Sequence, residues 1–198
     1  MSARNFKSND KQITLSAGNA KLDKSIAIFN LPAGSAYTCN CDCKGCYAKK
    51  AQYLYKQVLP CRVRNWEASK SENFVNSFQE ALNKAKKFGC SVVRLHESGD
   101  LYSKEYAEKL EKIASNNPDM KFYYYTKTDY QVKGCNVNQV NSLLPNGNIN
   151  YGKLDYVKEQ SKANSVKVCP VTLGVKTAIC GKNCKLCQHE SYMLFVIH

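Results

Sequence analysis

The sequence SIAIFNLPAGSAYTCNCDCKGC, residues 25–46, joins an apolar run directly to a dense group of cysteines. Residues 25–31 are rich in isoleucine and phenylalanine, which predicts a short buried β-strand. Pro32 and Gly34 then indicate a turn that ends the strand. This stretch therefore predicts a thiol-rich loop at the carboxyl end of a core strand.

Downstream of this stretch, expected helices alternate with expected strands. Apolar residues recur at helical spacing at residues 47–58, after Ser71, and after Ser103, and both serines are candidate N-caps. Gly89 would end the second of these helices, and a further helix is expected at residues 154–163. Strands are expected at residues 91–95, 121–126, 148–151 and 166–168. Residues 1–24 are polar, and we expect them to be partly irregular.

This alternation predicts one α/β domain, residues 1–198, built on a parallel sheet. A partial (β/α) barrel and an open doubly wound sheet both fit, with a cysteine-rich segment at residues 165–198. In either fold, ligands bind at the carboxyl ends of the strands. The first cysteine group and the segment HESGD, residues 96–100, both follow expected strands and so fall at such ends.

The composition limits which cellular compartment and which binding partners we expect for this protein. A chain of 198 residues with 43% hydrophobic residues suits a folded domain. It has no apolar run of the roughly 18 residues that a transmembrane helix needs, and no secretory signal core. We therefore expect a cytoplasmic protein without membrane contact. The net charge of +13 makes nucleic acid a candidate partner, although a lysine-coated surface explains the charge as well.

The first cysteine group suggests a soft-metal site. Eleven cysteines in a cytosolic chain favour metal binding or catalysis over disulfides. Cys39, Cys43 and Cys46 have the spacing C-x3-C-x2-C, which can hold three irons of a four-iron, four-sulfur (4Fe-4S) cluster and leave the fourth open. Cys41 would then be a spare thiol. Two structural zinc sites, or one zinc shared between the two cysteine groups, would explain the same residues.

The second cysteine group repeats this spacing at Cys180, Cys184 and Cys187. Cys169 follows an expected strand and offers a fourth ligand. Four thiolates would hold a closed second iron–sulfur cluster or a structural zinc. The remaining cysteines at 61, 90 and 135 stand alone, and we interpret them as ordinary core residues.

Polar side chains crowd the ends of two further expected strands. His96, Glu97 and Asp100 are candidate catalytic residues, and Ser98, Gly99 and Lys127 are candidate cofactor-binding residues. The spacing of Arg94 and His96 predicts that both point to one face of the strand. Alternatively, residues 98–100 form an ordinary turn before the next helix. The arginines of residues 62–65 would contact phosphate or lie in a surface loop.

Several motifs resemble the phage "gene product 88" family. They are the segment at residues 15–52, VRLHESGDLY at residues 93–102, FYYYTK at residues 122–127, and Cys169-Pro170 ahead of clustered cysteines. That family is similar to the radical S-adenosylmethionine (SAM) superfamily. The resemblance implies that SAM binds the open iron and is cleaved reductively, with electrons from a flavodoxin- or ferredoxin-type donor. It also implies a phage-encoded protein in the host cytoplasm.

Two hypotheses follow from these features. The first is a radical-SAM-like iron–sulfur protein whose substrate is undefined. The second is a zinc-stabilised module that binds nucleic acid or has a structural role without catalysis. The metal content of the purified protein distinguishes them.

Overall fold

The fold is built on a six-stranded sheet, seen in a computed structural model that describes residues 4–40, 43 and 46–196. The strands lie in chain order: β1 (Arg4–Lys7), β2 (Thr14–Ala17), β3 (Ile26–Phe29), β4 (Val92–Leu95), β5 (Lys121–Thr126) and β6 (Val137–Asn141). Neighbouring strands from β3 to β6 are parallel, whereas β1 and β2 form an antiparallel hairpin on the β3 edge. The expected parallel sheet is thus confirmed for β3–β6. The described strands form an open sheet and no closed barrel.

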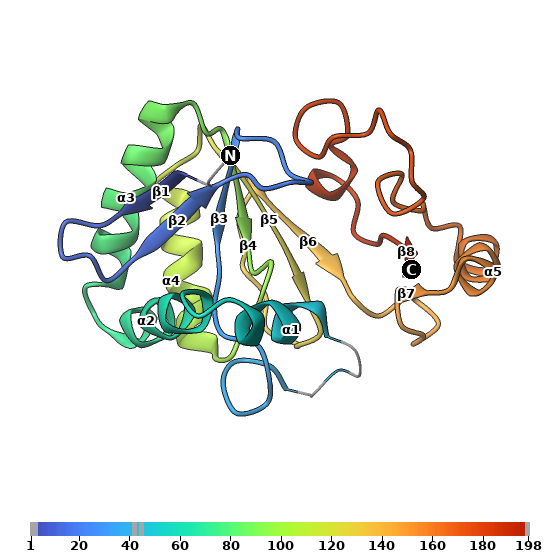
Figure 1. Cartoon of the computed structure of the whole chain (residues 1–198), viewed down its shortest axis with the longest axis horizontal. Helices are drawn as coiled ribbons and strands as arrows, with labels where there is room; N and C mark the ends of the chain where they lie inside the picture. The colour runs from blue at the N-terminus through green and yellow to red at the C-terminus, as the bar shows by residue number, and fades with distance from the viewer. Residues whose placement is uncertain (1–3, 41–42, 44–45, 197–198) are drawn as a thin grey trace.

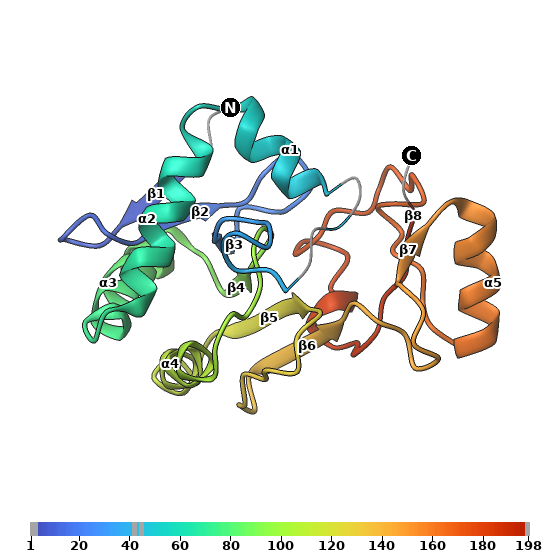
Figure 2. The same cartoon turned by 90° about the horizontal axis from the view of Figure 1, so that it is seen from below.

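One face of the sheet is covered by α3 (Phe74–Phe88) and α4 (Lys104–Ser115), which lie on the same side of the strands in Figure 2. Alternate strand residues contribute to this core: Ala27, Phe29, Val93, Leu95, Phe122 and Tyr124. The ring of Phe29 lies 5.0 Å from that of Phe78 on α3. Each fully buried ring of this kind contributes about 1.5–3 kcal/mol to stability. The apolar stripe of α3 therefore fixes this face of the sheet.

The opposite face is covered by the C-terminal segment rather than by helices of the sheet crossovers. Ile28 and Tyr123 on this face form a core cluster against Cys180 and Cys187. The segment also contains α5 (Leu154–Asn164), the single-turn η1 (Leu186–Gln188), and a small sheet of β7 (Tyr151–Gly152) and β8 (Phe195–Val196). The cysteine-rich segment thus occupies the side where a barrel would continue.

Two helices lie across the carboxyl ends of the parallel strands, as Figure 1 shows. They are α1 (Tyr47–Leu54) and α2 (Val58–Lys70), and both follow the first cysteine loop in the chain. Within the described part of the chain, no helix combines the length and apolarity required to span a bilayer.

Several predicted elements need correction. Residues 4–7 and 14–17 are strands, although residues 1–24 were expected to be partly irregular. The expected helix at residues 47–58 ends at Leu54 and is followed by the unpredicted α2, and β6 was also unpredicted. Residues 166–168 form no strand, because Val168 makes an isolated bridge with Leu194.

The two candidate N-caps had different outcomes. The Ser103 side chain accepts a hydrogen bond from the backbone N–H of Tyr106 at 3.2 Å, which confirms it as the cap of α4. Ser71 instead lies just beyond the end of α2, where its side chain donates to the backbone oxygen of Ala68. The residue that precedes α3 is Asn73, which makes no side-chain capping bond.

Candidate metal centre

The first cysteine loop follows β3 and ends where α1 begins. Cys46 is the N-cap residue of α1, and its backbone N–H donates to the Cys43 carbonyl at 3.2 Å. The Cys39 sulfur accepts a hydrogen bond from the Gly34 N–H at 3.4 Å. Cys41 lies outside the described residues. These two hydrogen bonds therefore fold the loop back on itself near each of its ends.

Lys127 places a positive charge on this loop from the end of β5. Its ammonium donates to the Cys43 sulfur at 2.9 Å and lies 5.3 Å from the centre of the Tyr151 ring. An ammonium at hydrogen-bond distance stabilises the thiolate form of a cysteine. Lys127, a predicted cofactor-binding residue, thus contacts a candidate metal ligand, and its cofactor role remains a prediction.

Cys39 lies in an environment that disfavours an unpaired thiolate. Burial raises the pKa of Cys39, opposed by the Gly34 hydrogen bond, while the nearby Asp100 and Cys46 add to the rise. A cation held against the sulfur would favour the thiolate further. Soft divalent metals and iron–sulfur clusters supply such a cation.

The second cysteine group gathers beneath the C-terminal segment, against the sheet. Burial raises the pKa of Cys180 to about 12, and the neighbouring thiols of Cys169, Cys187 and Cys184 raise it further. Burial raises the pKa of Cys187 to about 11, and a hydrogen bond from the Tyr125 hydroxyl opposes that rise. The four thiols predicted as one ligand set are therefore close enough to influence one another electrostatically.

The donor chemistry of both groups fits a thiolate-bound metal, but neither group is already arranged as a coordination sphere. Across residues 4–40, 43 and 46–196, no three His, Cys, Asp or Glu side chains are positioned to hold a metal ion. The sulfur atoms would have to move closer together on binding. The ligand roles of the seven cysteines remain predictions.

Asp100 connects the loops that follow three strands. Its carboxylate accepts hydrogen bonds from the Thr126 hydroxyl at 2.7 Å, the Leu101 N–H at 2.8 Å and the Lys127 N–H at 3.0 Å. Its own N–H donates to the Thr38 hydroxyl in the cysteine loop at 3.2 Å. Burial raises the pKa of Asp100, and the hydrogen bonds oppose this rise. This geometry gives Asp100 a positioning role, whereas its predicted catalytic role is untested.

His96 points away from the cysteine loop. Its backbone φ is +61°, and its Nε2 lies 2.8 Å from the Tyr106 hydroxyl on α4. Arg94 lies on the other face, with its guanidinium 5.1 Å from the centre of the Tyr125 ring. The expectation that Arg94 and His96 share a face is therefore wrong, because the positive φ ends the alternation of the strand. Burial lowers the pKa of His96 to about 3, so its ring is neutral.

Glu97 lies beside α1, next to the cysteine loop. Its backbone carbonyl accepts a hydrogen bond from the Tyr47 hydroxyl at 2.7 Å, and its carboxylate accepts one from the Asn19 amide at 2.7 Å. Since Tyr47 directly follows Cys46, this contact ties the HESGD segment to the start of α1.

Ser98 and Gly99 hold the loops after β3 and β4 together. The Ser98 hydroxyl donates to the Leu31 carbonyl at 2.9 Å. Gly99 has a φ of +85°, and a Cβ atom there would lie 2.7 Å from both the Leu31 Cβ and the Thr38 hydroxyl oxygen. These residues therefore serve close packing of two loops, and a cofactor contact is untested.

Sequence reasoning left Arg94 and Tyr125 without a site role. Both lie on the sheet face that meets the second cysteine group, where Arg94 lowers the pKa of Cys180 and Cys187 as a minor contribution. The sequence did contain a signal for this position. Arg94 and Tyr125 alternate with apolar residues on β4 and β5, which places them on the face of the sheet opposite the α3 core.

Comparisons with known proteins place the chain. Residues 4–154 match the family model described as "Gene product 88". The chain is 27% identical over 138 residues to "Gene 88 protein" of Mycobacterium phage L5, and 26% identical over 140 residues to "Gene 88 protein" of Mycobacterium phage D29. Each alignment covers 61% of this chain and 57% of the relative, so the match spans little more than half of each relative. No solved structure matches.

The matched span includes the first cysteine loop, the HESGD segment and Lys127, and it ends before the second cysteine group. Both relatives come from mycobacteriophages, which agrees with the expected phage affiliation. The extent of the family match is decisive: this chain belongs to the Gene product 88 family.

Proposed function

We propose that this protein binds an iron–sulfur cluster through Cys39, Cys43 and Cys46 and acts as a radical-SAM-like protein. One observation carries the proposal. The loops after the consecutive parallel strands β3, β4 and β5 meet at one edge of the sheet, where Lys127 contacts Cys43 and Asp100 contacts the Thr38 hydroxyl. Ligand sites of parallel α/β sheets lie at this edge.

The residues around the loop would have distinct roles in such a site. The ammonium of Lys127 would offset negative charge on the Cys43 thiolate. Asp100 would fix the backbone of Lys127 and the position of Thr38. A reduced cluster with SAM would supply one-electron cleavage of a carbon–sulfur bond, using electrons from a flavodoxin- or ferredoxin-type donor in the host cytoplasm.

Anaerobic reconstitution with iron and sulfide tests the cluster. The wild-type chain should gain iron, acid-labile sulfide and broad visible absorption. Cys43→Ser should lose much of this signal. Cys135→Ser is the matched control, because Cys135 is an exposed free cysteine that belongs to neither group, and this change should leave the signal unchanged. A wild-type protein that takes up zinc but no iron would refute the proposal.

SAM binding is a separate test. Equilibrium dialysis with radiolabelled SAM should show binding to the iron-loaded wild type and weaker binding to the Cys43→Ser variant. Release of 5′-deoxyadenosine on reduction would support radical-SAM chemistry. An intact cluster that neither binds nor cleaves SAM would leave an iron–sulfur protein of another type.

A structural zinc at the second cysteine group is the alternative, and one observation favours it. Cys169 and Cys184 are close enough to contribute to the raised pKa of both Cys180 and Cys187, as neighbouring ligands of a closed site would be. Elemental analysis of the Cys184→Ser variant separates the cases. Loss of zinc with retention of iron would assign zinc to this group and iron to the first.

A further inference from the structure

Two hollows adjoin at the outer edge of the sheet, on the two sides of β1. The first lies between β1 and α3 and has a volume of about 790 Å³. The second lies between the strands β1–β3 and the start of α2 and has a volume of about 470 Å³. Asn5 and Lys7 line both. Since β1 is the terminal strand of the sheet, the two hollows meet along its free edge.

These hollows are lined by most of the arginines in the chain, a larger share than the composition alone would place there. The chain has four arginines among its 29 basic residues, and three of them line the hollows. Arg4 belongs to the first hollow, and Arg62 and Arg64 belong to the second. Among the described residues, no Asp or Glu lines either hollow. Arginine binds phosphate with a planar fork of donors, so this placement favours a phosphate-bearing ligand over a merely lysine-coated surface.

The first hollow combines exposed charge with an aromatic platform. Lys7, Lys11 and Lys87 are exposed at its wall. The guanidinium of Arg4 lies 4.7 Å from the centre of the Phe88 ring. A guanidinium held flat on an aromatic ring gives a surface on which a nucleobase can stack.

The carboxylates nearest the first hollow are already engaged. Glu80 accepts a hydrogen bond from the Asn9 N–H at 2.7 Å, and Asp10 accepts one from the Ser77 hydroxyl at 2.6 Å. Neither carboxylate lines the hollow, whose lining includes the basic residues Arg4, Lys7, Lys11, Lys84 and Lys87.

Two residues that line the second hollow have a buried polar atom without a hydrogen-bond partner among the described residues. Thr14 is 7% exposed, and its hydroxyl makes no hydrogen bond with any described residue. The buried Nε of Arg64 also has no partner among the described residues. A buried polar atom without a partner costs about 1–3 kcal/mol, and a ligand that hydrogen-bonds to these two groups would offset that cost.

We propose that a single-stranded nucleic acid crosses the free edge of β1, with phosphates in both hollows and a base against Arg4 and Phe88. Two adjoining hollows on opposite sides of one edge strand fit a polymer better than a mononucleotide, since each hollow alone has the size of a small-ligand site. The inference does not depend on metal binding at the cysteine groups, although Arg62, which lines the second hollow, also donates a hydrogen bond to the Ala48 carbonyl on α1.

Fluorescence anisotropy with a labelled oligothymidylate of about 20 nucleotides tests the proposal on the anaerobically purified full chain. The variant Lys7→Gln/Lys11→Gln/Lys87→Gln should weaken binding at least ~10-fold at moderate salt. It should also reduce the slope of log K against log salt by about 2, because each phosphate contact on a single strand contributes about 0.7. Replacement of the same three lysines by arginine should retain binding.

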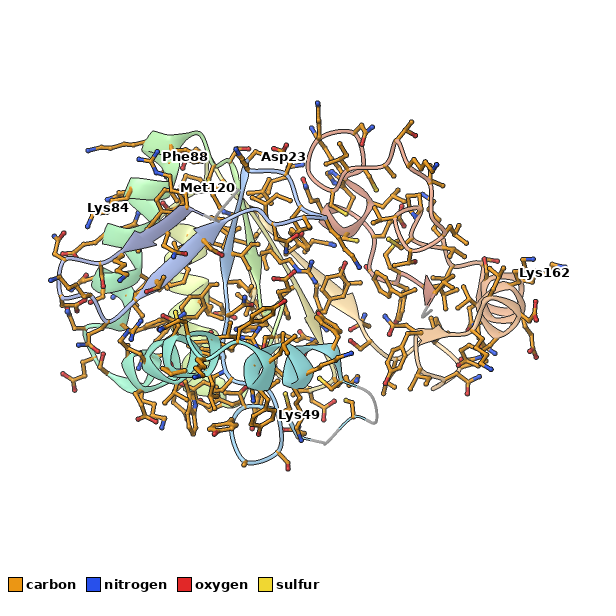
Figure 3. The ribbon with its side chains drawn as sticks, in the orientation of Figure 1. Asp23, Lys49, Lys84, Phe88, Met120 and Lys162 are labelled. Atoms are coloured by element: carbon orange, nitrogen blue, oxygen red, sulfur yellow. The ribbon has the colours of Figure 1, made fainter. Side chains whose placement is uncertain are left out.

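The matched control removes three charges from exposed positions at the other end of the molecule. Lys153→Gln/Lys158→Gln/Lys162→Gln changes α5 and its N-cap, and Figure 3 shows Lys162 far from Lys84 and Phe88 of α3. It should change affinity less than twofold. Equal losses in both triple variants would show unspecific charge attraction and overturn the proposal. Competition by thymidine monophosphate or inorganic phosphate at matched phosphate concentration would also overturn it, in favour of a small-anion site.

Discussion

Replacement of Gly99 by alanine should destabilise the protein through backbone strain and through close contacts with Leu31 and Thr38. Gly99 has a φ of +85°, a conformation that costs an L-amino acid about 1–2 kcal/mol. The new Cβ would also lie 2.7 Å from the Leu31 Cβ and from the Thr38 hydroxyl oxygen, far inside the usual carbon contact of about 3.5–4.0 Å. Overpacking of this kind costs about 1–3 kcal/mol, so the total loss should be about 2–5 kcal/mol.

Gly147→Ala is the matched control for this loss. Gly147 has a φ of +80°, and a Cβ there would meet no heavy atom within 4 Å. The control therefore carries the backbone cost of about 1–2 kcal/mol without the clash. Urea unfolding followed by far-ultraviolet circular dichroism measures both variants. Equal destabilisation of the two would refute the claim that close packing of the loops after β3 and β4 requires Gly99.

Three further predictions concern buried polar groups. Burial lowers the pKa of His96 from 6.5 to about 3, so the unfolded chain takes up a proton before the folded chain does, and stability falls as the pH drops below about 6.5. In His96→Gln, urea unfolding at a series of pH values should show that this loss of stability with falling pH is smaller by up to ~1.4 kcal/mol per pH unit. Asn65→Ala should cost about 2–4 kcal/mol of unfolding free energy, because the Asn65 side chain pairs with both backbone groups of Thr14; an unchanged unfolding midpoint would contradict this. Lys127→Met should slow iodoacetamide labelling of Cys43 at neutral pH in a variant with the other cysteines changed to serine, because the ammonium that contacts the sulfur is lost; an unchanged labelling rate would exclude the ion pair.

The elements that the sequence predicts well are those whose buried face is apolar. On α3, Phe74 and Phe78 are fully buried, and their spacing alone indicates the face that meets the sheet. The predicted cap Ser103 also has a local cause, because its hydroxyl binds a backbone N–H three residues ahead. Such local patterns need no knowledge of the rest of the chain.

The spacing of apolar residues does not predict helix α2, because the buried face of this helix is polar. Its buried residues are Arg62, Asn65 and Ser69, and the first two bind backbone groups outside the helix, at Ala48 and Thr14. Pro60 lies in the first turn, where a helix tolerates proline, but in the sequence alone a proline indicates an interruption of a helix. Hydrophobic periodicity cannot detect a helix that is held by hydrogen bonds to residues far away in the chain.

The orientation of His96 was also beyond sequence reasoning. A strand pattern places residues two apart on one face, and a single positive φ at the strand end reverses that assignment. The burial of His96 against Tyr106 depends on α4, which returns to this position only after the loop of residues 97–103. The predicted site residues do lie at the strand ends, whereas His96 points in a direction that the strand pattern did not predict.

The end of β5 connects the two cysteine groups. Tyr125 bonds to Cys187 of the second group, and Lys127, two residues further on, bonds to Cys43 of the first. Residues two apart in a strand share a face and lie about 7 Å apart. A metal at the second group would therefore brace the strand end from which Lys127 reaches the first, so its removal should loosen the first loop as well. The family match covers only the first group, yet the geometry of β5 makes the second group part of the same structural unit.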